Sequence, residues 1–345
     1  MKSLVINGRF LSQRMTGVHR YAYEMTCALK QIGVDFIVVA PRQILTSYDI
    51  VFPLEQTGKT NSHYWEQIEL TRYVRRHYKG ATILSFTGLG PILYNDNICT
   101  IHDMSFLANP GWFTAAYYWF YRLFTPVIAR RARKIITVSQ FSKQEIIQRL
   151  QIPAEKIIVA YNAVSNSIVG ERQNDKEKYL LAVSSLDPRK NLNRLVEAYR
   201  SLGNIGCKLY IVGAAHPSFR KGGIPENNDE NIIFKGYVGG SDLANLYANA
   251  LAAVYPSLYE GFGLPNVEAM ANHCPVVTSA IAPHHEVCAD AALYFDPYDT
   301  NSIANTLKTI IRDSNLRDKL REAGIVRLKQ FSWEKSAQVI YNNIR

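Results

Sequence analysis

The chain has 345 residues, which is enough for two domains, and its 47% hydrophobic and 20% charged residues are typical of a globular protein. It contains no apolar run near the roughly 18–20 residues of a membrane-spanning helix and no signal-peptide pattern, so a cytoplasmic protein is expected. Its five scattered cysteines predict buried, reduced thiols and give no zinc site.

The net charge of +10 is concentrated in the first half of the chain. Residues 1–165 hold 19 Lys and Arg against 10 Asp and Glu, whereas residues 166–345 hold 20 against 19. A basic half favours an anionic partner such as lipid headgroups, a phosphorylated acceptor or nucleic acid. An ordinary basic, soluble surface explains the same numbers equally well.

In chain order, the first half alternates strands and helices. Apolar segments at 2–7 and 35–40 predict strands, and the helical spacing of apolar residues over 18–29 predicts the helix between them. Further buried strands are expected at 82–85 and 98–101. This order is that of a doubly wound parallel sheet.

Two corners of this sheet carry candidate ligand-binding residues. Gly17 begins the first helix, and His102 and Asp103 follow a strand. Ligands of open α/β sheets bind at the carboxyl ends of the strands. Each position also has a structural explanation, since a turn can require a glycine and hydrogen bonds can hold a histidine in the interior.

The segment 112–134 is a long helical stretch rich in Tyr, Trp and Phe that ends in a cationic run at 130–134. Its aromatic face is suited to a membrane interface. Core packing is favoured instead, because a strand-like segment follows at once and makes the helix an ordinary crossover. A helix at 139–150 and a strand at 157–160 are expected next.

The second half begins after a polar, charged segment at 166–178, which predicts a linker. Strands and helices then alternate again, and a helix starting at Ser241 is expected to be capped by Ser241 and Asp242. The last helix, at 332–344, follows a complete second domain, so we expect it to return to the first. Further strands are expected at 179–184, 208–212, 232–234, 251–255, 275–278 and 292–295, with helices at 193–202 and from 300 onward.

The strand at 251–255 leads into a glycine-bearing turn flanked by two carboxylates, Glu260 and Glu268. Pro265 lies near the first turn of the following helix, where its missing N–H is not needed. The N–H groups and dipole at a helix start suit a phosphate, and ionised carboxylates accept hydrogen bonds from hydroxyl groups. The turn therefore predicts a nucleotide-sugar site.

A second turn of this kind follows the strand at 179–184 and carries Arg189 and Lys190. A guanidinium and an ammonium both suit a diphosphate. A solvated turn is an equal alternative for this segment alone, and its pairing with the Glu260 turn favours the diphosphate. The two cations balance the ligand's charge, and the sequence has no Asp-x-Asp triplet, so neither a metal nor another cofactor is expected.

Residues 260–270, E-G-F-G-L-P-N-V-E-A-M, resemble the E-x7-E signature of glycosyltransferase family four, which comprises retaining enzymes with the GT-B fold. The resemblance implies an α/β protein with two Rossmann-like, doubly wound domains facing a cleft. Residues 1–165 plus 331–345 would form the acceptor side, and residues 166–330 would bind the nucleotide-sugar. Further similar segments are 16–21 (T-G-V-H-R-Y), 101–103 (I-H-D), 138–143, 161–164, 188–191 (P-R-K-N) and 331–334 (F-S-W-E).

The resemblance implies four catalytic residues. Glu260 would hold hydroxyl groups of the donor sugar, and His102 would contact the sugar near the reacting carbon. Arg189 and Lys190 would bind the diphosphate and stabilise the charge that develops on it as it leaves. Asp103 is adjacent to His102, and neighbouring residues of a strand point to opposite faces, so Asp103 cannot be assigned as the nucleophile. Front-face displacement with retention is therefore favoured.

The resemblance also implies the remaining donor contacts. Glu268 would accept the ribose hydroxyls, and Gly17 would let the backbone approach the phosphate. The nucleobase would lie against the backbone near Tyr237 and Val238. The other donor-binding residues would be Gly261, Phe262, Gly263 and Leu264.

The sequence departs from the family pattern at three places: Ser185 stands where arginine is frequent, His273 replaces a usual glycine, and His284-His285-Glu286 replaces a Pro-Glu turn. These differences affect the finer donor contacts.

The expected function is transfer of a hexose or deoxyhexose, such as mannose or rhamnose, to a saccharide acceptor. The basic first half suggests a lipid-linked acceptor of an O-antigen or capsule polysaccharide and peripheral contact with an anionic membrane at the inner face of the plasma membrane. A nucleotide-sugar epimerase of the same fold is the main alternative. A phosphorylase of this fold would require a cofactor lysine and a far longer chain. A basic nucleic-acid-binding protein is the third alternative, although no nucleic-acid motif is present.

Overall fold

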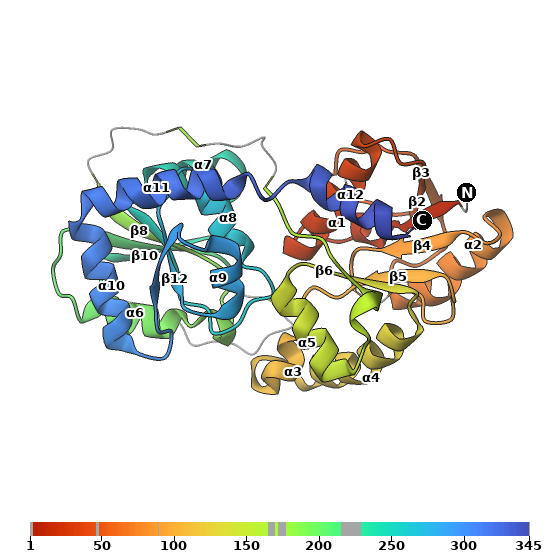
Figure 1. Cartoon of the computed structure of the whole chain (residues 1–345), viewed down its shortest axis with the longest axis horizontal. Helices are drawn as coiled ribbons and strands as arrows, with labels where there is room; N and C mark the ends of the chain where they lie inside the picture. The colour runs from red at the N-terminus through yellow and green to blue at the C-terminus, as the bar shows by residue number, and fades with distance from the viewer. Residues whose placement is uncertain are drawn as a thin grey trace. The chain divides into compact units, whose positions relative to one another are not determined.

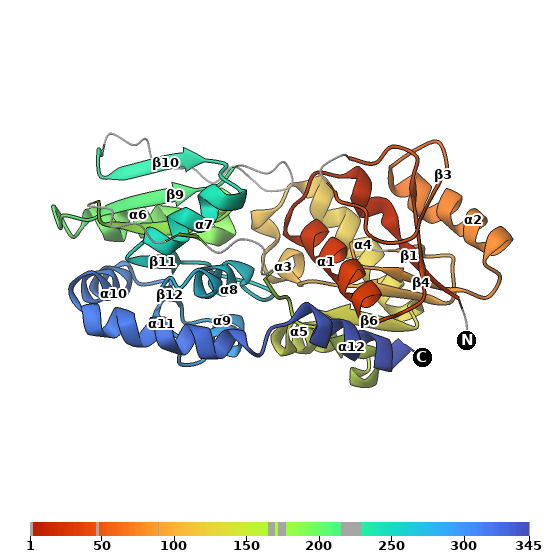
Figure 2. The same ribbon diagram turned by 90° about the horizontal axis from the view of Figure 1, so that it is seen from above.

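The computed structural model describes residues 3–45, 48–88, 90–164, 170–171, 177–214 and 229–344. The chain divides into two compact units (Figures 1 and 2). Unit 1 comprises Met1–Leu107, Trp119–Asn162 and Ser332–Arg345, and unit 2 comprises Ala108–Tyr118 and Ala163–Phe331. The sequence did not suggest that Ala108–Tyr118 groups with the second half, and most of the linker expected at 166–178 lies outside the described residues.

The described part of unit 1 contains a seven-stranded parallel sheet in the order β3-β2-β1-β4-β5-β6-β7. Short runs of Val and Ile form its central strands, because such a sheet is covered on both faces. The strands are β1 (Leu4–Asn7), β2 (Ile37–Pro41), β3 (Leu54–Thr57), β4 (Thr82–Ser85), β5 (Asn97–Thr100), β6 (Lys134–Thr137) and β7 (Ile157–Val159). The helices are α1 (Gly17–Gln31), α2 (Leu70–His77), α3 (Ser105–Ala108), α4 (Ala115–Arg131), α5 (Gln140–Leu150) and α12 (Trp333–Ile344). The last residue of α3 and the first four residues of α4 fall in the segment that groups with unit 2.

The final helix α12 packs against α1 within unit 1. The Trp333 ring lies 5.7 Å from the ring of Tyr21, and the Ser336 hydroxyl donates to the Tyr161 carbonyl at 2.8 Å. Arg133 also donates to the Ile344 carbonyl, at 2.5 Å. These contacts attach the end of the chain to the unit in which it begins.

The described part of unit 2 contains a six-stranded parallel sheet in the order β10-β9-β8-β11-β12-β13, with helices on both faces (Figures 1 and 2). The order reverses between β8 and β11. The strands are β8 (Tyr179–Val183), β9 (Lys208–Val212), β10 (Ile232–Gly236), β11 (Ala252–Tyr255), β12 (Val276–Ser279) and β13 (Ala292–Phe295). The helices are α6 (Leu192–Arg200), α7 (Gly240–Asn249), α8 (Leu264–Ala271), α9 (Ala282–Cys288), α10 (Thr300–Arg312) and α11 (Ser314–Leu328).

Two expectations from the sequence were wrong or incomplete. Gly239 occupies the N-cap position of α7, which has no side-chain capping bond, so Ser241 and Asp242 lie inside the helix rather than at its cap. The segment 53–80, to which no element was assigned, contains β3 and α2.

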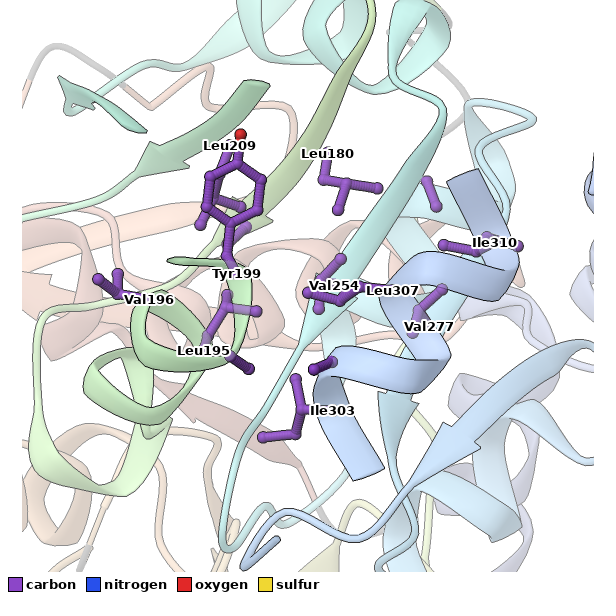
Figure 3. Packing of buried hydrophobic residues seen from close by; sticks show 14 of the residues in the cluster. Leu180, Leu195, Val196, Tyr199, Leu209, Val254, Val277, Ile303, Leu307 and Ile310 are labelled. Carbon is purple, nitrogen blue, oxygen red and sulfur yellow. The ribbon is translucent and has the colours of Figure 1, made fainter. Parts of the chain in front are cut away.

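The core of unit 2 fills the space between the sheet and the helices α6 and α10 (Figure 3). Leu195 and Tyr199 of α6 and Ile303 and Leu307 of α10 are almost completely buried with Val254 of β11. Burial of this apolar surface fixes the strands whose ends carry the candidate site.

We expect Leu307→Ala to lower the free energy of unfolding of unit 2 by about 2–5 kcal/mol, because it leaves a cavity in a closed core. Urea denaturation followed by circular dichroism measures the loss. Val326→Ala is the control, since that side chain is 64% exposed; it should change the free energy by less than about 0.5 kcal/mol. Equal effects of the two substitutions would contradict this description of the core.

Candidate functional site

The candidate site of unit 2 lies where the strand order reverses, between β8 and β11. Connections leave these two strands toward opposite faces of the sheet, which opens a crevice at their carboxyl ends. The turn after β8 carries Arg189 and Lys190, and the turn after β11 carries Glu260. The sheet topology therefore brings the two turns predicted from the sequence together.

A nearly buried ion pair joins these turns. Lys190 Nζ lies 2.5 Å from Glu260 Oε1, and the Ser257 hydroxyl donates to the same oxygen at 2.8 Å. Burial alone would raise the pKa of Glu260, but the charges of Lys190 and Arg189 and the hydrogen bond from Lys190 lower it to about 2. Glu260 is therefore an ionised carboxylate that can only accept hydrogen bonds.

Backbone and amide contacts reinforce the pair. The Leu258 N–H donates to the Arg189 carbonyl at 2.8 Å, and Asn191 Nδ2 donates to the Pro256 carbonyl at 3.1 Å. Asp187 Oδ1 accepts the Arg189 N–H at 3.1 Å and lies 3.6 Å from Arg189 Nε. The two turns thus form one unit of structure, with each cation next to a carboxylate.

Glycine is required at two points of this arrangement. Gly263 has φ +89° at the N-cap of α8, and a Cβ there would lie 2.7 Å from Asn266 Nδ2 and 2.9 Å from His284 Cδ2. Gly213 has φ +153°, and its Cβ would lie 1.7 Å from the Ser184 carbonyl oxygen. A larger residue at either position would be strained and would force these neighbours to shift. Gly213 follows β9 and was not among the predicted site residues.

A small pocket opens between the two turns. Its lining includes Ser184, Lys190, Glu260, Asn266 and His284. The Ser184 hydroxyl and both polar atoms of the Asn266 amide are buried without a hydrogen-bond partner among the described residues. Buried polar groups are normally satisfied, so these atoms are suited to a water molecule or to a hydroxylated ligand. Neither residue was assigned a role from the sequence.

His284 is a buried, neutral member of this site. Its Nδ1 lies 3.2 Å from the Ser279 carbonyl and 2.7 Å from Thr278 Oγ1. Because a carbonyl only accepts, we assign the ring proton to Nδ1, which leaves Nε2 as the acceptor beside Gly263. Burial lowers the pKa of His284 to about 4, although Glu260 opposes the shift. The sequence showed this residue only as a departure from the family pattern.

Glu268 lies on α8, half-buried, with its carboxylate beside a tyrosine pair. Tyr247 donates to Glu268 Oε2 at 3.5 Å, and the Tyr255 hydroxyl lies 3.0 Å from that of Tyr247 and donates to the Pro265 carbonyl at 2.8 Å. Burial raises the pKa of both tyrosines, so they remain hydrogen-bond donors. The two carboxylates of the E-x7-E segment therefore have separate surroundings.

The other predicted donor contacts differ in exposure. Gly261 and Phe262 are buried, and the Phe262 ring packs edge-on against Phe331 at 5.5 Å. Leu264 and Val238 are half-buried. Tyr237 follows β10 with 79% of its surface exposed. These residues keep their predicted roles as hypotheses.

In unit 1, Gly17 lies at the amino end of α1, and His102 follows β5. Gly17 is exposed, has no left-handed φ, and a Cβ there would meet nothing within 4 Å, so local packing does not require a glycine. His102 Nε2 lies 3.0 Å from the Phe86 carbonyl, which places the proton on Nε2, and burial lowers the pKa of the ring. Asp103 Oδ1 accepts hydrogen bonds from the backbone and hydroxyl of Ser105.

Two family models match the chain. Residues 15–167 match the model described as Glycosyltransferase Family 4, and residues 165–327 match the one described as Glycosyl transferases group 1. The chain belongs to glycosyltransferase family four. The resemblance inferred from the E-x7-E segment is thereby confirmed.

Known relatives support this membership. The chain of this glycosyltransferase is 28% identical over 330 residues to the O-antigen chain mannosyltransferase RfbU of Salmonella typhimurium, covering 89% of this chain and 90% of the relative. It is 33% identical over 220 residues to the O-antigen chain mannosyltransferase B of Escherichia coli, covering 59% of this chain and 58% of the relative.

Solved structures confirm the fold class. The Anabaena protein HepE in complex with UDP-glucose aligns with a TM-score of 0.73 at 18% identity, covering 99% of this chain and 98% of that one. WaaG, a glycosyltransferase involved in lipopolysaccharide biosynthesis, aligns with a TM-score of 0.71 at 15% identity, covering 99% of both chains. Both units of this glycosyltransferase are Rossmann-like, as the GT-B fold requires.

Among the described residues, this glycosyltransferase has no group of three or more His, Cys, Asp or Glu side chains placed to hold a metal ion. In the same residues, no helix is long and apolar enough to cross a membrane.

The low pKa of Glu260 predicts that the stability of the protein depends on pH in the acid range. Its folded-state pKa of about 2 lies below the ordinary value of 4.5, so its stabilising contribution is present above about pH 4.5 and is lost as the pH falls toward 2. Between pH 5.5 and pH 3, wild type should lose roughly 2 kcal/mol more stability than Glu260→Gln, at about 1.4 kcal/mol per pKa unit. Urea denaturation across this range measures it, and parallel curves for the two proteins would refute the charge assignment.

Proposed function

We propose that this glycosyltransferase transfers mannose, or a related hexose or deoxyhexose, from a nucleoside-diphosphate sugar to a saccharide acceptor. The acceptor is a lipid-linked intermediate of an O-antigen-type polysaccharide. The reaction retains the anomeric configuration, needs no metal and takes place at the cytoplasmic face of the membrane. The two relatives named as O-antigen chain mannosyltransferases support the sugar and the polysaccharide class.

One observation supports the proposal most directly. The small pocket between the two turns combines an ionised Glu260 with Lys190. It also includes two polar side chains, Ser184 and Asn266, that are buried without a hydrogen-bond partner among the described residues. Carboxylate and amide groups suit the hydroxyls of a sugar, and cations suit a diphosphate. A structural neighbour solved with UDP-glucose has the same fold, which makes a nucleotide-sugar a reasonable ligand for this chain.

In the proposed reaction, Arg189 and Lys190 stabilise the diphosphate as the bond to the anomeric carbon breaks. Lys190 has three donor hydrogens, so it can hold Glu260 and a phosphate oxygen together. Glu260 orients the sugar hydroxyls, and Glu268 accepts the ribose hydroxyls. Front-face attack, with the leaving diphosphate oxygen taking the acceptor's proton, requires no protein nucleophile. His102 contacts the sugar near the reacting carbon, and Gly17 permits a close backbone approach to the phosphate.

We expect donor binding to depend on Glu268 and Arg189. Isothermal titration of GDP, UDP and dTDP, and then of GDP-mannose, against wild type identifies the base. Glu268→Ala and Arg189→Ala should each weaken the affinity for the nucleotide that wild type binds by about 10- to 100-fold, because each removes charged hydrogen bonds. Glu322→Ala and Arg312→Ala, at exposed positions of α11 and α10, are the charge-matched controls. Unchanged nucleotide affinity in both site variants would contradict the assignment of the donor site.

We expect the product to keep the donor's anomeric configuration. NMR of the product from the identified donor and a short saccharide acceptor reads the configuration directly, and it also detects an epimerised sugar. Activity should be unchanged after dialysis against excess EDTA, because the cations of the site balance the diphosphate. An inverted product would rule out front-face displacement, and activity that only a divalent metal restores would rule out the metal-free mechanism.

A further inference from the structure

Unit 1 contains a fully buried carboxylate, that of Glu66. The residue lies in a π-helical turn, Trp65–Glu69, directly before α2. Its side chain has no exposed surface, and its Oε2 has no hydrogen-bond partner among the described residues. Buried polar atoms are normally satisfied, and π-helical turns are frequent at functional sites. The unsatisfied carboxylate oxygen therefore points to a role in binding.

Glu66 lies at the switch point of the unit 1 sheet. The strand order of this sheet reverses between β1 and β4, and the last residues of these strands are Asn7 and Ser85. Asn7 Nδ2 donates to Glu66 Oε1 at 2.8 Å and to the Ser85 hydroxyl at 3.2 Å. Ligands of open α/β sheets bind at this position. The buried carboxylate is thus fixed where the topology of unit 1 favours a ligand.

Two partly exposed side chains face the unsatisfied oxygen. Arg9 Nη1 lies 3.6 Å and His63 Nδ1 lies 3.4 Å from Glu66 Oε2. The Arg9 side chain is 13% exposed and that of His63 is 46% exposed, so a ligand can reach both although Glu66 is covered. Asn7 Oδ1 accepts the Arg9 N–H at 3.2 Å, and the Asn61 carbonyl accepts from Arg9 Nε at 3.2 Å. The carboxylate and the guanidinium are therefore held by the same strand end.

The two contacts at Glu66 Oε2 are longer than the ~3.2 Å of a good N–H···O hydrogen bond. A small movement of Arg9 or His63 would complete a bond to this oxygen. Hydrogen bonds of functional sites are often long in the absence of substrate and shorten when it is bound. The long distances are therefore expected of a site that tightens around its ligand.

The exposed atoms of Arg9 and His63 suit a neutral, hydroxylated ligand. Arg9 can only donate, and a carboxylate can only accept, so a neutral His63 ring carries its proton on Nδ1 toward Glu66 and accepts at Nε2. A saccharide hydroxyl both donates and accepts, so two adjacent hydroxyls match this pair. The opposite charges of Arg9 and Glu66 cancel, which weakens the attraction for an anion.

Aromatic side chains lie next to this pair. The His63 ring is 5.1 Å from the ring of Phe120, and the neighbouring Tyr64 is 55% exposed. Small-molecule sites commonly combine aromatic surface with a few placed polar groups. Apolar ring surface beside a donor and an acceptor is the combination that a sugar ring requires.

We propose that Arg9 and His63 bind adjacent hydroxyl groups of the acceptor saccharide and that Glu66 is a positioning residue, which holds both side chains without touching the sugar. The proposal rests on the proposed function, because that function supplies the saccharide acceptor. It adds the side chains that recognise the acceptor, and it assigns them to the neutral sugar and not to a phosphate.

Saccharide binding to the full chain, without donor, is the first test. Saturation-transfer NMR with the methyl glycosides of mannose, galactose, glucose and N-acetylglucosamine should detect binding of at least one of them to wild type. His63→Ala and Arg9→Lys should each weaken that binding about tenfold, because each removes hydrogen bonds to the sugar. His77→Ala and Arg76→Lys, at exposed positions of α2 in the same unit, are the matched controls and should bind as wild type does.

The kinetics of Glu66→Gln test the positioning role. This substitution keeps the shape of the side chain, and it should raise the KM for the saccharide acceptor about tenfold while the KM for the donor stays unchanged. In an Arg9→Lys/His63→Ala background, Glu66→Gln should raise the acceptor KM by less than about twofold, because its effect acts through those two residues. A merely structural role of Glu66 would give the full effect in both backgrounds.

Four outcomes would overturn the proposal. The first is that none of the glycosides binds wild type, and the second is equal binding by the site variants and the controls. The third is an equal rise of the donor and acceptor KM values in Glu66→Gln. The fourth is tighter binding of inorganic phosphate than of any glycoside, lost in His63→Ala, which would assign the pair to an anion.

Nucleotide titrations of the same variants separate this test from that of the donor site. GDP and UDP should bind His63→Ala and Arg9→Lys as they bind wild type. Saccharide binding that depends on His63, in a protein that binds no nucleotide, would support this site and contradict the proposed donor.

Discussion

The ion pair between Lys190 and Glu260 is the constraint on which the candidate site of unit 2 depends. Two charges removed from water are stable only when each has its partner and further hydrogen bonds, and removal of one partner is costly. Ser257 supplies the additional bond at Glu260 Oε1. The residues are 70 positions apart, so the pair forms only if β8 and β11 are neighbours, and it then fixes both turns at the strand ends.

The shape of the turns comes from groups that are small or neutral. Gly263 and Gly213 allow backbone to pass where a Cβ would collide with Asn266 or with the Ser184 carbonyl. His284 fills the space beside Gly263 without adding a charge, because its burial keeps the ring neutral near pH 7. A protonated imidazole there would compete with Lys190 for Glu260. A neutral ring therefore leaves Lys190 as the hydrogen-bonded cationic partner of the carboxylate.

The sequence predicted the fold because its signals are local. Buried parallel strands such as β1 and β9 are continuous apolar runs, and the helices between them have their own periodicity. The prediction from the sequence failed where tertiary contacts determine the local structure. The strand β3, with the sequence Leu-Glu-Gln-Thr, has no apolar signal and exists because β2 offers it an edge. At the site, glycines and charges marked the two turns, but the Lys190–Glu260 contact, the Asn266 amide and the neutral His284 depend on which strands are adjacent.

The candidate site of unit 2 depends on local charges and not on the net charge of its half of the chain. Residues 166–345 carry a net charge of +1, although they contain the predicted site for a diphosphate. Local placement of Arg189 and Lys190 is sufficient there, because a few fixed charges at short range act more strongly than a diffuse excess that salt screens. The +9 of residues 1–165 is therefore not needed to hold the donor.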